Sequence, residues 1–105
     1  MSDYPVVLVT APTTAEAESI ARMLLERRLI ACANILSGVA SLFWWQGKID
    51  RAEEVLLVMK TRQDRLDEVT AAVIEAHSYD VPEVVALPIS GGSEAYLRWI
   101  DESLG

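Results

Sequence analysis

Two side chains in the sequence, His77 and Cys32, are of types that carry out chemistry near neutral pH, and each is the only one of its kind in the chain. Histidine is the commonest metal ligand, so for His77 a metal role competes with a structural role at the end of a helix. Cys32 lies between two alanines at the head of an apolar run, where we expect it to pack as a small hydrophobic residue and not to react. No third residue stands out that would orient this pair for catalysis, so we predict that the chain is not an enzyme.

Acidic residues and tryptophans lie on either side of a glycine-containing turn. Asp50, Glu53 and Glu54 follow the turn, and such charged runs are usually solvated, although they can also attract cations. Trp44 and Trp45 precede it, and in an extended strand neighbouring side chains point to opposite faces. We therefore expect at most one of the two to line a cleft, with core packing as the alternative.

These residues belong to a predicted β-hairpin that lacks a polar face. Its first strand covers residues 32–45, its turn residues 46–48, and a second extended run residues 55–61. Alternate residues of the first strand form one face from Ile35, Ser37, Val39, Ser41, Phe43 and Trp45, and another from Leu36, Gly38, Ala40, Leu42 and Trp44. An antiparallel sheet in a monomer commonly keeps one face in water, so we expect helices to cover one face and copies of the same chain to cover the other.

The other predicted strands and helices, taken with this hairpin, follow the order of a known fold class. Short apolar runs predict strands at residues 5–11 and 84–89, and helical spacing of apolar residues predicts helices at 14–28 and 64–76. A Ser-Gly-Gly-Ser loop at residues 90–93 is expected to cap a last short helix that begins at Glu94. Apart from that helix, the order is the split βαβ arrangement of ferredoxin-like α+β domains, which leaves one face of the sheet bare.

Length, composition and charge favour a single assembling domain and exclude some classes of partner. The 105 residues fit a single domain over residues 1–105, and a hydrophobic content of 51% is high for that size, which favours burial between subunits. A net charge of −7 with only nine Lys and Arg argues against nucleic acid as a partner. The early apolar run at residues 6–9 is far shorter than a membrane span, and no basic leader region precedes it. With one cysteine and no possible intrachain disulfide, we expect a cytoplasmic protein.

Several motifs, in this order and spacing, resemble the CutA family of divalent-cation tolerance proteins. They lie at residues 31–35, 41–48, 54–55, 60–61, 77–79, 82–83 and 96–99. The resemblance implies a homotrimer of ferredoxin-like subunits, similar to the PII signal transducers, with a role in tolerance of copper or other divalent cations and no established enzyme activity. It implies a cleft between subunits formed by Trp45, Glu54, Lys60, His77, Tyr79 and Glu83.

The chain also departs from the family pattern at places that matter for metal binding. Some family members are described with a cysteine in the first strand and a His-His pair as metal ligands, and the matching positions here are Val9, Ala76 and His77. A site for Cu²⁺ or another divalent cation must therefore rest on His77 with oxygen ligands such as Glu54, Glu83 or a neighbour's carboxylate. Such a site is expected to be weak.

Two further substitutions and one alternative function complete the comparison with the pattern. The family's His-Pro-Tyr is His77-Ser78-Tyr79 here, and Phe43 replaces a strand tyrosine. The alternative to metal binding is a PII-like regulatory or scaffolding trimer. It would sense a small ligand at the cleft between subunits through Lys60, Tyr79 and Glu83.

Overall fold

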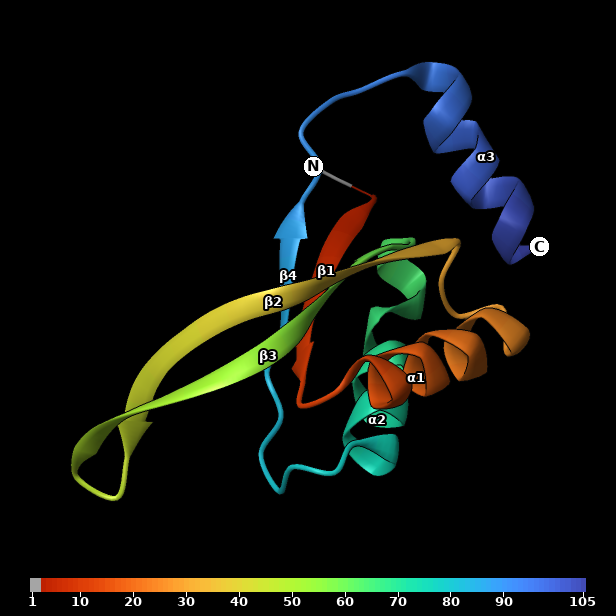
Figure 1. The fold of residues 1–105 in the computed structure, drawn as a ribbon. Coiled ribbons are helices and arrows are strands. Elements are labelled where there is room, and N and C mark those ends of the chain that lie inside the picture. The colour runs from red at the N-terminus through yellow and green to blue at the C-terminus, as the bar shows by residue number, and fades with distance from the viewer. Residues whose placement is uncertain (1–2) are drawn as a thin grey trace.

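The computed structural model describes residues 3–105, which build one four-stranded antiparallel sheet and three α-helices (Figure 1). The elements are β1 (Pro5–Ala11), α1 (Thr14–Glu26), β2 (Cys32–Trp45), β3 (Lys48–Lys60), a 3₁₀ turn (Gln63–Arg65), α2 (Leu66–Ala76), β4 (Val84–Pro88) and α3 (Glu94–Leu104). The strand order is β2-β3-β1-β4, with every neighbouring pair antiparallel. This is the split βαβ arrangement, so the predicted ferredoxin-like α+β fold is confirmed.

The helix and strand ends differ from the predicted ones for local reasons. The first helix stops at Glu26 and not at residue 28, because Arg28 takes a φ of 58° and the Leu29 N–H bonds back to the Leu24 carbonyl. That pattern ends many helices, usually with glycine in the position of Arg28. The last helix begins as predicted, since the Ser93 hydroxyl accepts the Tyr96 N–H at 3.3 Å.

The second hairpin strand is much longer than predicted. It begins at Lys48 and not at residue 55, because the acidic stretch pairs with β2 as far as the turn, where Trp45 lies opposite Lys48. The fourth strand ends at Pro88, which has no N–H for the ladder and lies on an edge strand, as expected. The hairpin therefore extends well past the rest of the sheet.

Both long helices, α1 and α2, cover one face of the sheet (Figure 1). Strand residues facing them alternate with outward ones, and the buried set is Val7, Val9 and Ala11 from β1 with Val55, Leu57 and Met59 from β3. Ile20, Leu24, Val69 and Val73 from the helices complete this core. Burying each such side chain stabilises the fold by about 1.5–3 kcal/mol, which makes this face the main source of stability.

A bulge in β2 reverses which of its residues face the helices. Residues directly opposite on neighbouring strands share a face, and Ile35 lies opposite a buried residue of β3, whereas Leu36 lies on the other face. The register then shifts, so that Val39 pairs with Glu54 and lies on the same face as Leu36. Gly38 allows the shift with a φ of 72°. The prediction that Ile35 and Val39 share a face is therefore wrong.

The face of the sheet away from α1 and α2 carries exposed apolar side chains. Leu36, Val85 and Leu87 are each about half exposed there. The hairpin projects from the rest of the molecule (Figure 1). With the hairpin included, the molecule measures 44 × 26 × 23 Å. On this projection Leu42 is 72% exposed and Ile49 is 68% exposed. The sequence-based expectation of a bare apolar face is met within one chain.

The last helix, α3, buries Ile100 and Leu104 and is further held by polar contacts. Asp101 accepts the Tyr4 hydroxyl at 2.6 Å and pairs with Arg62 at 3.2 Å. Two further arginines donate to its final carbonyl groups, Arg28 to Ser103 at 2.9 Å and Arg65 to Leu104 at 3.2 Å. Cations suit the negative end of a helix dipole, so α3 is held at its carboxyl end.

Candidate functional site

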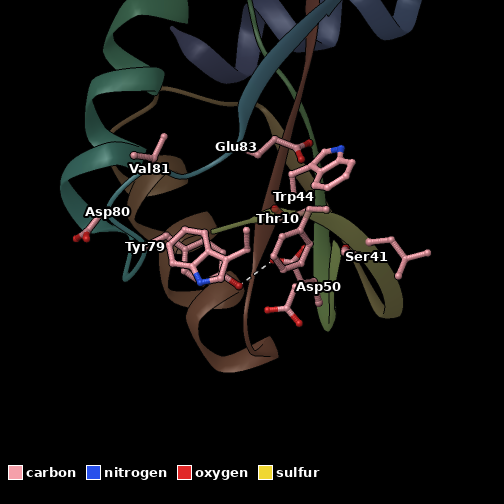
Figure 2. Close-up of a pocket in the computed structure, with 12 residues that line it drawn as sticks. Thr10, Ser41, Trp44, Asp50, Tyr79, Asp80, Val81 and Glu83 are labelled. Atoms are coloured by element: carbon pink, nitrogen blue, oxygen red, sulfur yellow. Dashed lines mark hydrogen bonds between the residues drawn. The ribbon is translucent and has the colours of Figure 1, made fainter. Parts of the chain in front are cut away.

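A cleft of about 920 Å³ lies between the hairpin and the segment that joins α2 to β4 (Figure 2). β2 and β3 supply one wall, residues 79–83 supply another, and Thr10 of β1 lies between them. The cleft thus depends on the length of the hairpin, because only two strands remain paired beyond the end of β1.

Aromatic side chains form much of the lining. Phe43, Trp44 and Trp45 come from β2, and Tyr79 comes from the segment after α2. Both tryptophans line the cleft, so the prediction that at most one could do so is wrong. Two-stranded ribbons twist more strongly than wide sheets, which removes the strict separation of the two faces at the end of the hairpin. The sequence signal for two aromatic side chains in the cleft is the Trp-Trp pair beside the turn, because the strand is strongly twisted there.

Four carboxylates share the same cleft, and they come from both walls. They are Asp50 and Glu54 of β3 together with Asp80 and Glu83 of the following segment. None of the lining residues is lysine, arginine or histidine. A site with this charge attracts cations and repels phosphates and other anions.

Glu54 is the buried member of this group, with 9% of its surface exposed. One of its oxygens, Oε2, accepts the Tyr79 hydroxyl at 2.8 Å. Burial raises the pKa of Tyr79 to about 12, and the hydrogen bond to the Glu54 carboxylate adds to the effect. Tyr79 therefore remains a hydrogen-bond donor to Glu54 across the physiological pH range.

His77 lies behind the cleft with its side chain fully buried. Its Nδ1 accepts the Tyr79 N–H at 3.0 Å, so the ring proton resides on Nε2, which donates to the Thr10 carbonyl oxygen at 2.7 Å. The ring also packs on that of Tyr79, with centroids 4.7 Å apart. Both nitrogens are thus occupied within one chain, and His77 acts on the cleft by fixing Tyr79.

Glu16 of α1 ties the same segment to the core. One carboxylate oxygen accepts both the N–H and the hydroxyl of Ser78, at 3.0 and 2.9 Å, and lies 3.4 Å from His77 Nδ1. Burial would raise the pKa of Glu16, but the two hydrogen bonds from Ser78 outweigh it and lower that pKa. Ser78 stands where the family pattern has proline, which has no N–H to donate.

The predicted ligand residues are only partly brought together. Trp45, Tyr79, Glu54 and Glu83 line the cleft. Lys60 does not, because it lies at the other end of β3, opposite Cys32, and its Nζ donates to the Asn34 side chain. Sequence reasoning missed Phe43 and Trp44, which it placed with the core or assembly, and Asp50 and Asp80, which it treated as solvated or did not consider.

The predicted metal ligands do not form a complete set within one subunit. Across residues 3–105 no three side chains of His, Cys, Asp or Glu come close enough to hold a metal ion. With both nitrogens of His77 already bonded, a metal ligand set of His77, Glu54 and Glu83 does not fit the geometry of a single chain. A metal site would need carboxylates from a second copy.

Fold and cleft together define a class: a ferredoxin-like α+β protein with a projecting hairpin and an acidic, aromatic cleft at its side. The family of the CutA1 divalent ion tolerance protein matches residues 5–103. The divalent-cation tolerance protein CutA of Archaeoglobus fulgidus is 45% identical over 98 residues, which cover 93% of this chain and 95% of that protein. The chain belongs to the CutA1 divalent ion tolerance family.

Solved structures and plant relatives agree with this assignment. CutA from Xylella fastidiosa has a TM-score of 0.96 at 35% identity, covering 99% of this chain and 100% of that one. The periplasmic divalent cation tolerance protein of Archaeoglobus fulgidus has a TM-score of 0.94 at 43% identity, covering 97% and 99%. The chloroplastic CutA 1 of rice is 45% identical over 93% of this chain, which spans only about half (55%) of that protein.

Within residues 3–105, no helix has the length and apolar character needed to cross a membrane.

Proposed function

We propose that this chain acts, without catalysis, as a homotrimeric divalent-cation tolerance protein that binds cations in the cleft beside each hairpin. The observation that carries the proposal is the lining of the cleft, which combines four carboxylates with no basic side chain. Family membership supports tolerance of divalent ions as the physiological context.

The bare face of the sheet supports assembly. Leu36 of β2 and Val85 and Leu87 of β4 leave apolar side chains exposed at both edges of this face, and the hairpin adds Leu42 and Ile49. Monomeric proteins rarely expose such surfaces, and obligate interfaces resemble a core cut in half. The number three, and the likeness to PII trimers, follow from the family resemblance. Light scattering coupled to size exclusion tests the assembly, and a monomer at micromolar concentration would rule it out.

Bound metal would be coordinated mainly by oxygen. Since His77 is bonded at both nitrogens, we expect carboxylates such as Glu54 and Glu83 to act with a carboxylate of a neighbouring subunit. Among divalent ions, Cu²⁺ binds most nitrogen and oxygen sites ahead of Zn²⁺. With so few ligands from one chain, we expect modest affinity.

Calorimetric titration of the intact protein tests cation binding. We expect heat from Cu²⁺ and none from inorganic phosphate, and a marked loss of Cu²⁺ binding in the double variant Glu54→Gln/Glu83→Gln. The matched control is Glu18→Gln, an exposed carboxylate of α1 that does not line the cleft. Binding of phosphate in place of Cu²⁺ would overturn the proposal.

The aromatic walls favour a second candidate, a PII-like regulatory or scaffolding trimer that responds to a small ligand. Phe43, Trp44 and Tyr79 offer apolar surface that a hydrated metal ion does not use. The acidic lining restricts such a ligand to one that carries positive charge. Saturable quenching of tryptophan fluorescence by a small organic molecule, without metal, would favour this candidate.

We also propose a cytoplasmic location. Cys32 is a free thiol, and a protein without disulfides suits a reducing compartment. Relatives are described as chloroplastic or periplasmic, so subcellular fractionation of the native protein is the test.

A further inference from the structure

We propose that the cleft binds an organic ammonium cation, with Glu54 as its counter-charge and the rings of Trp44, Trp45 and Tyr79 as its walls. The inference rests on the proposed function only in assigning a cation to this cleft. It goes further by naming the chemical class of the ligand.

The distribution of the carboxylates favours an organic cation over a bare metal ion. A divalent ion needs several ligand atoms converging within 2–3 Å of one point. The acidic side chains of the cleft come from two walls, and within residues 3–105 no three potential ligands gather closely enough for that. An ammonium group needs one carboxylate and a surrounding of negative potential, which Asp50, Asp80 and Glu83 provide around Glu54.

Glu54 is placed to act as that single carboxylate. It is about nine-tenths buried in the wall of the cleft, and only its Oε2 is engaged, by the Tyr79 hydroxyl. Among the residues that the structure describes, none donates a hydrogen bond or forms an ion pair to its other oxygen, Oε1. Oε1 therefore reaches the surface of the cleft, where an ammonium group would meet a carboxylate that has no cationic partner among the described residues.

The aromatic side chains suit the apolar part of such a ligand. Trp44 is 75% exposed and Trp45 is 59% exposed, although both are large apolar groups. Cations bind the faces of aromatic rings, with tryptophan the best of them, and alkyl groups on the nitrogen add apolar contact with the same rings. A volume of about 920 Å³ suits a small organic molecule better than a single ion.

The test compares two molecules of equal shape and different charge. The intact protein is titrated with (2-hydroxyethyl)trimethylammonium and with 3,3-dimethylbutan-1-ol, its neutral isostere, followed by tryptophan fluorescence and calorimetry. We expect saturable binding of the ammonium compound at least tenfold tighter than that of the alcohol. Equal affinities, or no saturation by the ammonium compound, would overturn the inference.

A variant of Glu54 tests whether the charge of this residue is responsible for binding of the ammonium compound. Glu54→Gln keeps an oxygen that can accept the Tyr79 hydroxyl and removes only the charge, so we expect ammonium affinity to fall at least tenfold while the circular dichroism stays unchanged. The control Glu18→Gln should bind as the unaltered protein does. If Glu54→Gln does not fold, the comparison of the two isosteres on the unaltered protein still decides the question.

A parallel titration with CuCl₂ separates this inference from the proposed function. Binding of Cu²⁺ without the ammonium compound would overturn the inference and leave the proposed function intact. Failure of both would overturn both. Binding of the ammonium compound that excess Cu²⁺ displaces would support one shared cleft.

Discussion

The contact between Glu16 and Ser78 offers a direct test of how the cleft is held in place. We consider Glu16→Gln, which removes the charge of a carboxylate that accepts two hydrogen bonds from Ser78, and compare it with Glu18→Gln, an exposed change two residues away on the same helix. Hydrogen bonds to charged groups contribute about 1.5–3 kcal/mol each, and those to neutral groups about 0.5–1.5 kcal/mol. The amide oxygen of glutamine can still accept both hydrogen bonds, so the variant loses the part that the charge contributes. We therefore expect Glu16→Gln to lower the free energy of unfolding by about 1–3 kcal/mol, and Glu18→Gln by less than about 0.5 kcal/mol.

The assay is urea denaturation followed by circular dichroism, at one fixed protein concentration because assembly contributes to stability. Hydrogen exchange at the Ser78 and Tyr79 amides gives a local readout, and both should exchange faster in Glu16→Gln. Equal stability and equal exchange in the two variants would refute the idea that Glu16 fixes this segment.

Acid provides an independent check on Glu16. Its pKa is lower in the folded protein than the ordinary value of 4.5, because the Ser78 hydrogen bonds outweigh the effect of burial. A lowered folded pKa means that the contribution is fully present above the unfolded value and is lost as pH falls through the folded one. The stability difference between the unaltered protein and Glu16→Gln should therefore shrink below about pH 4.5. A constant difference down to pH 3 would contradict this assignment.

Three further predictions concern the hairpin and the histidine. Leu57→Lys should prevent folding, because it places an unpaired charge at a fully buried site at a cost of several kcal/mol. Leu42→Lys changes an exposed site and should leave the subunit folded but block assembly. Size exclusion reports the assembly of each variant, and circular dichroism reports its folding. Gly38→Val should lower the free energy of unfolding by about 1–2 kcal/mol in a urea titration. The cause would be backbone strain, since an added Cβ meets no atom within 4 Å. Gly91→Val is the control, because Gly91 does not have a positive φ. His77→Ala should weaken Cu²⁺ binding indirectly, with faster exchange at the Tyr79 amide; unchanged exchange with lost Cu²⁺ binding would instead make His77 a ligand.

The order of elements could be predicted because it rests on local signals. Apolar periodicity, the capping residue Thr13 and the cap at Ser93 act within a few residues of the chain, and the helices and strands they indicate are present. The bulge at Gly38 could not be predicted, since a glycine in an apolar run also fits an unbroken strand. The extension of β3 towards Lys48 was missed because acidic residues have low strand propensity, which cross-strand pairing overrides here.

The site was harder to predict than the fold because long-range contacts create it. His77 carries the residue type of a metal ligand, but its partner is the carbonyl of Thr10, 67 residues away. Lys60 and Glu54 lie on one strand, yet the length of the hairpin separates them and leaves only Glu54 in the cleft. Residue types thus identified chemically capable side chains, whereas the tertiary fold decides which of them remain available.

The attachment of α3 gives this small protein an element that responds to ionic strength. Apart from Ile100 and Leu104 the helix buries little, and it is otherwise fastened by partly exposed contacts of Asp101, Arg28 and Arg65. Salt at physiological strength screens charges over about 8 Å, and higher salt weakens such contacts further while the apolar core is unaffected or strengthened. The hydrogen bond from Tyr4 to Asp101 joins residues 97 positions apart, so loosening α3 removes one contact of the segment ahead of β1, which keeps its backbone hydrogen bonds to Gln63 and Ile89. In concentrated salt the molecule would therefore keep its sheet and two-helix layer, and α3 would be the first element to loosen.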